Sequence, residues 1–102
     1  MSDKLISVTQ KIAKRVGNKP AFGHKVKILL SDVGTIYVDG TGDKNHVTND
    51  AKDADLTLKT TLSIMQEIDQ GSLDAFSAYM QGKLSIEGDQ SIAVAFGALL
   101  ES

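Results

Sequence analysis

The stretch AYMQGKLSIEGD, from Ala78 to Asp89, contains a helix end, a strand and the start of a second helix. Gly82 follows apolar residues at helical spacing, and glycine commonly ends a helix in the left-handed conformation. Leu84 and Ile86 then alternate with polar residues, which is typical of a strand with one buried face. Asp89 is well placed to cap the next helix. This stretch therefore predicts a helix, a strand and a helix in close succession.

The predicted last helix is unusually apolar, because no polar side chain occurs from Ile92 to Leu100. Ile92, Phe96 and Leu99 form one apolar face, yet the other positions leave little polar surface, unlike an ordinary surface helix. The run is far shorter than the roughly 20 residues that cross a bilayer. Three interpretations stay open: burial on both sides, pairing with another chain, or a wall of a lipid-filled cavity.

The first segment predicts an amphipathic basic helix that ends near Gly17 and Asn18. Its apolar residues recur at helical spacing: Leu5, Val8, Ile12 and Val16. Seven of the eleven Lys and Arg residues precede Val33, although the whole chain has a net charge of −2. The basic face is either simply solvated or touches anionic membranes. The negative overall charge and the absence of aromatic residues among the basic ones argue against nucleic acid as a partner.

The middle of the chain reads as a β-meander followed by two helices. Alternation of apolar and polar residues predicts strands over residues 25–30, 35–39 and 55–59. The first two should form a hairpin, and the segment 40–53 reads as a polar loop. An apolar stripe over 62–68 predicts a helix that Gly71 ends, with Ser72 as the cap of the next helix. Helices and strands in this order predict an α+β fold with an antiparallel sheet that is covered on one face.

Two motifs resemble the sterol carrier protein 2 family, namely DADLTLKTTLSIMQEIDQG (Asp53 to Gly71) and AYMQGKLSIEGD. The resemblance extends from Leu5 to Leu100. It implies a five-stranded, mainly antiparallel sheet with helices on one face and an apolar tunnel between them. It also implies noncovalent binding of a fatty acid, an acyl-CoA ester, a phospholipid or a sterol, with no catalysis and no cofactor.

The resemblance, together with the predicted faces, implies a set of tunnel-lining residues from the helices and the sheet. They are Val38, Ile64, Met65, Ile68, Phe76, Met80, Leu84, Ile86, Ile92, Phe96 and Leu99. Arg15 and Lys19, around the turn after the first helix, are candidates to hold an anionic head group. The simpler alternative is that these two cations are exposed charges that only aid solubility.

Length and composition set the remaining expectations. We expect one lipid-binding domain over residues 1–102. The chain has no cysteine, and its N-terminus has no run that resembles a signal peptide. It ends without the peroxisomal Ser-Lys-Leu signal, so we expect a cytoplasmic protein. His24 and His46 are the only histidines, and no G-x-S-x-G motif accompanies them. No catalytic or metal-binding residue is therefore predicted.

The predicted function is the transfer or presentation of a lipid by a monomer. The alternative is an accessory module that docks through its apolar last helix on an enzyme of lipid or quinone metabolism. The two differ in stoichiometry, because a carrier binds about one lipid whereas a module forms an oligomer or complex whose stability does not respond to lipid.

Overall fold

The computed structural model describes residues 2–100, and within that range the chain forms four helices and five strands. In chain order they are α1 (Asp3–Gly17), β1 (Lys25–Leu30), β2 (Gly34–Asp39), β3 (His46–Thr48), β4 (Leu56–Thr60), α2 (Leu62–Asp69), α3 (Ala75–Met80), β5 (Ser85–Gly88) and α4 (Gln90–Leu100). The predicted α+β class is confirmed.

The strands form one sheet in the order β3-β2-β1-β4-β5. β1 and β2 make the predicted antiparallel hairpin, with Val26 opposite Val38 and Ile28 opposite Ile36. β3 is antiparallel to β2, and β5 is antiparallel to β4. β1 and β4 are parallel. The sheet is therefore mixed but mainly antiparallel.

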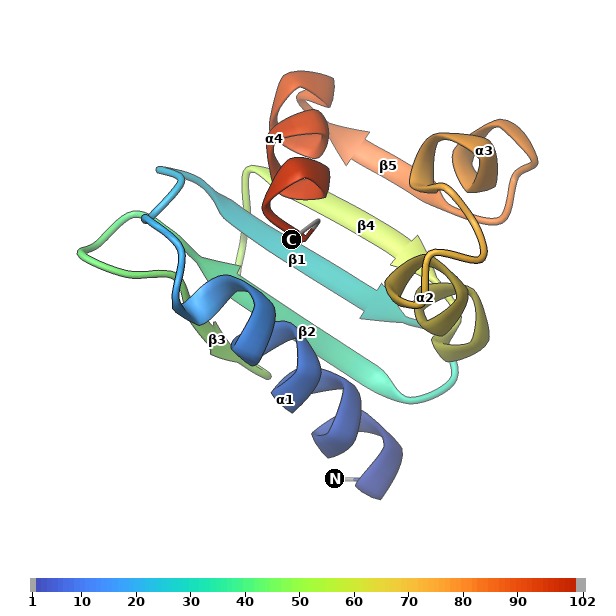
Figure 1. Cartoon of the computed structure of the whole chain (residues 1–102), viewed down its shortest axis with the longest axis horizontal. Helices are drawn as coiled ribbons and strands as arrows, with labels where there is room; N and C mark the ends of the chain where they lie inside the picture. The colour runs from blue at the N-terminus through green and yellow to red at the C-terminus, as the bar shows by residue number, and fades with distance from the viewer. Residues whose placement is uncertain (1, 101–102) are drawn as a thin grey trace.

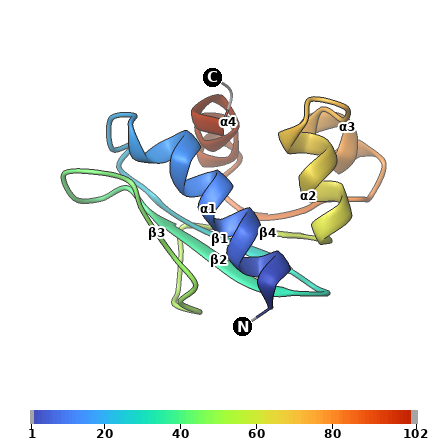
Figure 2. The same cartoon turned by 60° about the horizontal axis from the view of Figure 1, so that its bottom comes forward.

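The predicted meander is wrong at the third predicted strand, β4. It lies beside β1, because β3 takes the outer edge of β2 and places Val47 opposite Val38. β3 falls inside the predicted loop, and its three residues are too few to show alternation. The chain then crosses to β4 on the face of the sheet without helices (Figure 2), where the Tyr37 hydroxyl donates a hydrogen bond of 2.7 Å to the carbonyl oxygen of Asp53.

All four described helices lie on one face of the sheet (Figures 1 and 2). α1 packs on β2 and β3, and α4 lies beside α1 over β4 and β5. α2 and α3 lie on the other side of α4 in Figure 1 and pack less closely on the sheet. The buried apolar core comprises Leu5, Val8, Ile12, Val16, Val26, Ile28, Leu30, Ile36, Val38, Leu56, Leu62, Met65, Ile92 and Phe96. Most of the core therefore lies between the sheet and the pair α1 and α4.

Glycine ends both of the middle helices, as predicted. Gly71 after α2 has φ 78° and Gly82 after α3 has φ 76°, a left-handed conformation that glycine adopts at little cost. The predicted cap of α3 is wrong by two residues. The backbone N–H of Ser72 donates to Glu67 and so belongs to the turn that closes α2. The side chain of Asp74 caps α3 instead.

Only one side of α4 is buried. The Asp89 carboxylate accepts hydrogen bonds from the backbone N–H of Ser91 at 2.8 Å and from its hydroxyl at 2.7 Å, so the predicted cap is confirmed. Ile92 and Phe96 point into the core, whereas Val94 on the opposite side is 74% exposed. Burial of α4 on both sides is therefore excluded within a single chain.

No helix within residues 2–100 is long and apolar enough to span a membrane.

Candidate functional site

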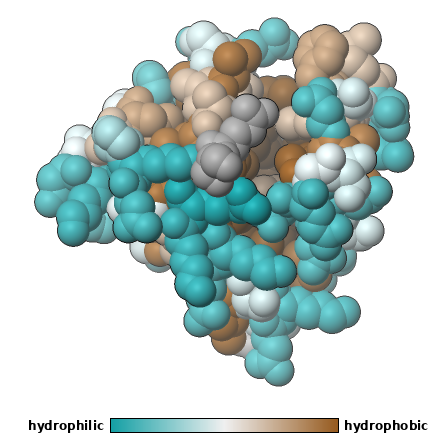
Figure 3. Space-filling view, in the orientation of Figure 1, coloured by the Kyte–Doolittle hydropathy of each residue, from teal (hydrophilic) through white to brown (hydrophobic). Residues whose placement is uncertain are grey.

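A cleft of about 470 Å³, lined by both apolar and polar residues, opens on the helical side of the molecule. Figure 3 shows a hollow on this face, between α4 and the side formed by α2 and α3. The cleft is lined by Arg15, Met65, Ile68, Asp69, Gln70, Gly71, Leu73, Asp74, Ala75, Gly97 and Leu100. Its apolar walls come from α2, the start of α3 and the end of α4. At Gly97 the wall has no side chain, and no heavy atom lies within 4 Å of the position that a Cβ would take.

A second, basic hollow of about 610 Å³ adjoins the cleft, because both are lined by Arg15 and Asp69. The other residues around it are Lys11, Lys14, Asn18 and Lys19. Four cations therefore surround a space that carries one carboxylate. This arrangement favours an anion next to an apolar chain.

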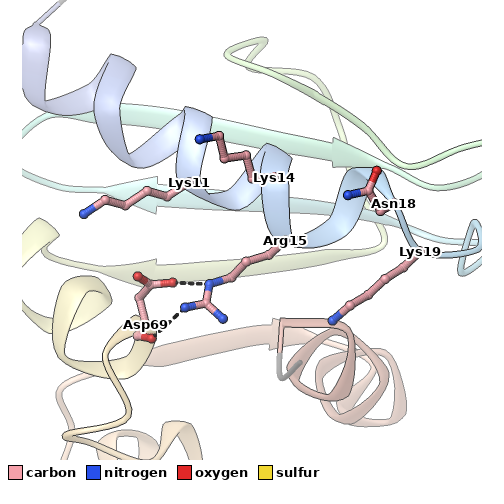
Figure 4. Close-up of a pocket in the computed structure, with 6 residues that line it drawn as sticks. All are labelled: Lys11, Lys14, Arg15, Asn18, Lys19 and Asp69. Atoms are coloured by element: carbon pink, nitrogen blue, oxygen red, sulfur yellow. Dashed lines mark hydrogen bonds and ion pairs between the residues drawn. The ribbon is translucent and has the colours of Figure 1, made fainter.

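Arg15 lies on the boundary between the cleft and the basic hollow and joins three helices. Its Nε lies 2.6 Å from Asp69 Oδ1, and its Nη2 donates to the backbone carbonyl of Asp69 at 3.1 Å. Its Nη1 donates to the carbonyl of Leu100 at 3.2 Å. Lys19 Nζ donates to the carbonyl of Leu99, and Figure 4 shows both cations reaching across from the end of α1. Cations at the carboxyl ends of helices satisfy unpaired carbonyls and complement the helix dipole.

The simpler interpretation of Arg15 and Lys19, as exposed solubilising charges, is therefore wrong. Both side chains are half-buried and both bind backbone oxygens at the end of α4. Both side chains also line the basic hollow, so they lie at a cavity as well as at helix ends. Both residues hold helix ends together, and their predicted role at a head group stays a prediction.

The other residues predicted to line a tunnel divide into three groups. Met65 and Ile68, both on α2, line the cleft. Val38, Leu84, Ile92 and Phe96 are buried, and Ile64, Ile86 and Leu99 are half-buried. Phe76 and Met80 are exposed at 68% and 67%. The last two point outward because Ala78 occupies the inner side of α3 and is completely buried.

Several residues that line the cleft or the basic hollow were not predicted from the sequence patterns. Leu73 lies in the short connection between α2 and α3, where no periodicity marks it. Gly97 has no side chain to signal a wall, and Asp69 is acidic in a region predicted to be apolar. Lys11 and Lys14 carried a signal, since they belong to the basic helix, but a local pattern cannot show that they face a cavity.

Neither His24 nor His46 lines either hollow, and His46 is exposed beside Asp43 with a 3.5 Å separation. Among the described residues, no group of three or more His, Asp and Glu side chains is placed to hold a metal ion. The geometry fits noncovalent binding of a molecule with an apolar tail and an anionic head.

Several solved structures share this fold. The fold is similar to sterol carrier protein 2 of Aedes aegypti in complex with the C16 fatty acid palmitate, with 27% identity, a TM-score of 0.72 and coverage of 99% of this chain and 97% of that chain. It is also similar to sterol carrier protein 2 like 2 of Aedes aegypti, at 22% identity and a TM-score of 0.69, with coverage of 93% and 94%.

The fold is likewise shared with the ubiquinone synthesis protein UbiJ-SCP2, at 16% identity and a TM-score of 0.70, with coverage of 99% of this chain and 93% of that one. No individual curated protein matches the sequence significantly. The model of the SCP-2 sterol transfer family, however, matches residues 9–101. On that match over most of its length, together with the shared fold, the chain belongs to the SCP-2 sterol transfer family.

Proposed function

We propose that this protein binds one lipid noncovalently and transfers it or presents it to an enzyme. The single observation that carries the proposal is the cleft that meets a basic hollow at Arg15. Family membership supports lipid binding in general, and the palmitate complex of the mosquito relative supports a fatty tail as the ligand. The volume of the cleft, about 470 Å³, lies within the range of roughly 300–1,000 Å³ that is usual for ligand pockets.

In this proposal the tail lies against Met65, Ile68, Leu73 and Leu100, and the anionic head lies near Arg15 and Lys19. Burial gives about 0.8 kcal/mol per methylene, so a long alkyl chain contributes roughly 10 kcal/mol before the costs of association. Micromolar affinity requires about 8 kcal/mol after those costs, so contacts of the head group must add to the burial of the tail. The larger heads of acyl-CoA esters and phospholipids would occupy the basic hollow. The tunnel residues other than Phe76 and Met80, the monomeric state and the cytoplasmic location stay predictions.

Gly97 provides the sharpest test of the cleft. Gly97→Leu places a branched side chain in open space at the wall and should weaken palmitate binding at least about tenfold. Gly97→Ala is the matched control and should leave binding close to that of the wild type. Both substitutions remove a glycine from the interior of a helix, so neither should reduce the free energy of unfolding. Native mass spectrometry gives the stoichiometry, and a titration gives the affinity.

The expected result is one palmitate per chain in the wild type and in Gly97→Ala. Wild-type affinity in a folded Gly97→Leu variant would remove the cleft as the binding site.

The accessory module is the second candidate, and the exposed side of α4 favours it. Val94 is 74% exposed, and Ala95 and Ala98 are exposed with it. In that case the purified protein would be a lipid-free oligomer, or part of a complex, whose melting temperature does not respond to palmitate. The same mass spectra distinguish the two candidates.

A further inference from the structure

Four large hydrophobic side chains are exposed on the two short uncharged helices α3 and α4, and three of them, Phe76, Met80 and Val94, are far more exposed than Tyr79. Phe76 and Met80 are 68% and 67% exposed and lie one turn apart on α3, and Val94 is 74% exposed on α4. Neither helix contains a charged residue. We name Phe76, Met80 and Val94 the apolar rim. Exposed apolar groups of this kind mark interaction sites when they gather on one surface.

The apolar rim belongs to two helices that each contribute to the lining of the cleft. Ala75, next to Phe76, lines the cleft on one side, and Gly97, one turn from Val94, lines it on the other. Figure 3 shows apolar surface over α3 and over α4 on either side of the hollow. A planar apolar phase that touched both helices would therefore cover the mouth of the cleft.

The positive charge of the basic hollow favours an anionic partner for this surface. Lys11, Lys14, Arg15 and Lys19 line the hollow that adjoins the cleft, so these cations lie close to the two helices that carry the apolar rim. A symmetric contact with a second copy would bring two such basic surfaces close together, which repulsion disfavours. An anionic bilayer satisfies both features, because it offers negative head groups and an apolar interior.

We propose that this side of the protein docks on an anionic lipid bilayer, with the apolar rim inserted at the boundary between head groups and acyl chains. Phe76 and Met80 would then contact membrane lipid and would not line the cleft. The cleft would open directly against the membrane, so that a tail enters without crossing water. The inference rests on the proposed lipid carrier function and assigns the surface through which loading occurs.

Labelling can test the insertion directly, because the chain has no native cysteine. The single substitution Met80→Cys receives an environment-sensitive fluorophore, and Ser85→Cys, exposed on β5, serves as the matched control. Each delipidated protein is mixed with vesicles of phosphatidylcholine alone or with added phosphatidylglycerol. We expect a blue shift only for the label at position 80 and only with the anionic vesicles. A shift that depends on protein concentration without vesicles would mean that a second copy covers the rim, and would overturn the proposal.

A variant pair tests the contribution of the rim to binding. The double substitution Phe76→Ser and Met80→Gln should weaken binding to anionic vesicles at least about tenfold. Ile6→Ser is the control, since Ile6 is also an exposed apolar residue at 39% but lies on the flank of α1 away from Lys11 and Arg15. Wild-type vesicle affinity in the double variant, or a silent label at position 80, would overturn the proposal.

Palmitate binding in the absence of vesicles separates this inference from the proposed function. The double variant should bind palmitate as the wild type does, because neither residue lines the cleft. If the wild type bound no palmitate, the proposed function would fail, while the vesicle experiments would still decide whether the rim inserts.

Discussion

At the scale of single residues, Arg15 has both a structural and a proposed functional role. Its guanidinium group binds Asp69 and the carbonyl of Leu100, and so links α1 to the ends of α2 and α4. An anionic head group in the basic hollow would have to share Arg15 with Asp69 or displace that carboxylate. Asp69 is therefore expected to reduce the affinity for anionic ligands.

Asp69→Asn should tighten palmitate binding by about twofold to fivefold, because the substitution removes the competing carboxylate from a partly exposed ion pair. The neutral alcohol hexadecanol should bind equally to both proteins. A titration with each ligand measures the difference. Glu67→Gln makes the same change of charge on α2 without lining either hollow, and should have a smaller effect. An equal effect of both variants would show that only net charge matters.

At the scale of secondary structure, α4 has one buried side and one exposed side although its residues from Ile92 to Leu100 are all without polar side chains. Ile92 and Phe96 lie one turn apart and are buried, and the Phe96 ring centroid lies 5.9 Å from that of Phe22. Val94 lies between them in sequence and points to solvent. The spacing of the large residues predicted the face with Ile92, Phe96 and Leu99, but the pattern could not show that the apolar residues on the opposite side would stay exposed, because no polar residue marks that side.

The start of α4 predicts a pH dependence of stability. Hydrogen bonds from the hydroxyl and the backbone N–H of Ser91 hold the pKa of the Asp89 carboxyl below its ordinary value. The charged form is favoured in the folded state, so Asp89 stabilises the fold above its ordinary pKa. That contribution is lost as the pH falls through the lower pKa of the folded state. Asp89→Ala should therefore lower the melting temperature at neutral pH, and its difference from the wild type should shrink in acid.

Thermal melts of both proteins across the acidic range measure this effect. Asp89→Asn is the control, because asparagine also caps helices but does not titrate. A difference between wild type and Asp89→Ala that stays constant with pH would contradict the assignment.

At the scale of the whole molecule, Asn45 joins segments that are far apart in the chain. Its Oδ1 accepts a hydrogen bond from the backbone N–H of Phe22 at 3.2 Å, and its Nδ2 donates to the carbonyls of Val16 and Pro20 at 3.0 Å each. Asn45 is 5% exposed. A Cβ at Gly40 would lie 2.6 Å from Asn45 Oδ1, so this close approach requires glycine. Asn45 thus ties the connection between α1 and β1 to the loop before β3.

Asn45→Ala should lower the free energy of unfolding by about 3 kcal/mol, because several buried backbone groups would lose their partner. Denaturant unfolding measures the change. Asn18→Ala removes the same amide from an exposed position and should change stability by less than about 0.5 kcal/mol. A similar loss in both variants would mean that the buried hydrogen bonds of Asn45 contribute little.

Local patterns predicted much of the fold but only part of the site. The alternation in 25–39 correctly predicted the hairpin, and the glycines at 71 and 82 correctly predicted two helix ends. Arg15 and Lys19, the predicted head-group candidates, line the basic hollow, and their role toward a ligand stays a prediction. The pairing of β4 with β1 was not predictable in the same way, because strand partners depend on contacts between distant segments.

The sequence by itself determined where most elements begin and end and which family the chain resembles, since capping residues, glycine and periodicity act over a few neighbouring residues. The tertiary structure alone decided that Phe76 and Met80 face outward and that Asp69 meets Arg15. It also decided that α1, α2, the start of α3 and the end of α4 share one cleft. These features arise when separate helices pack on one sheet, and no local pattern records which of their sides will meet.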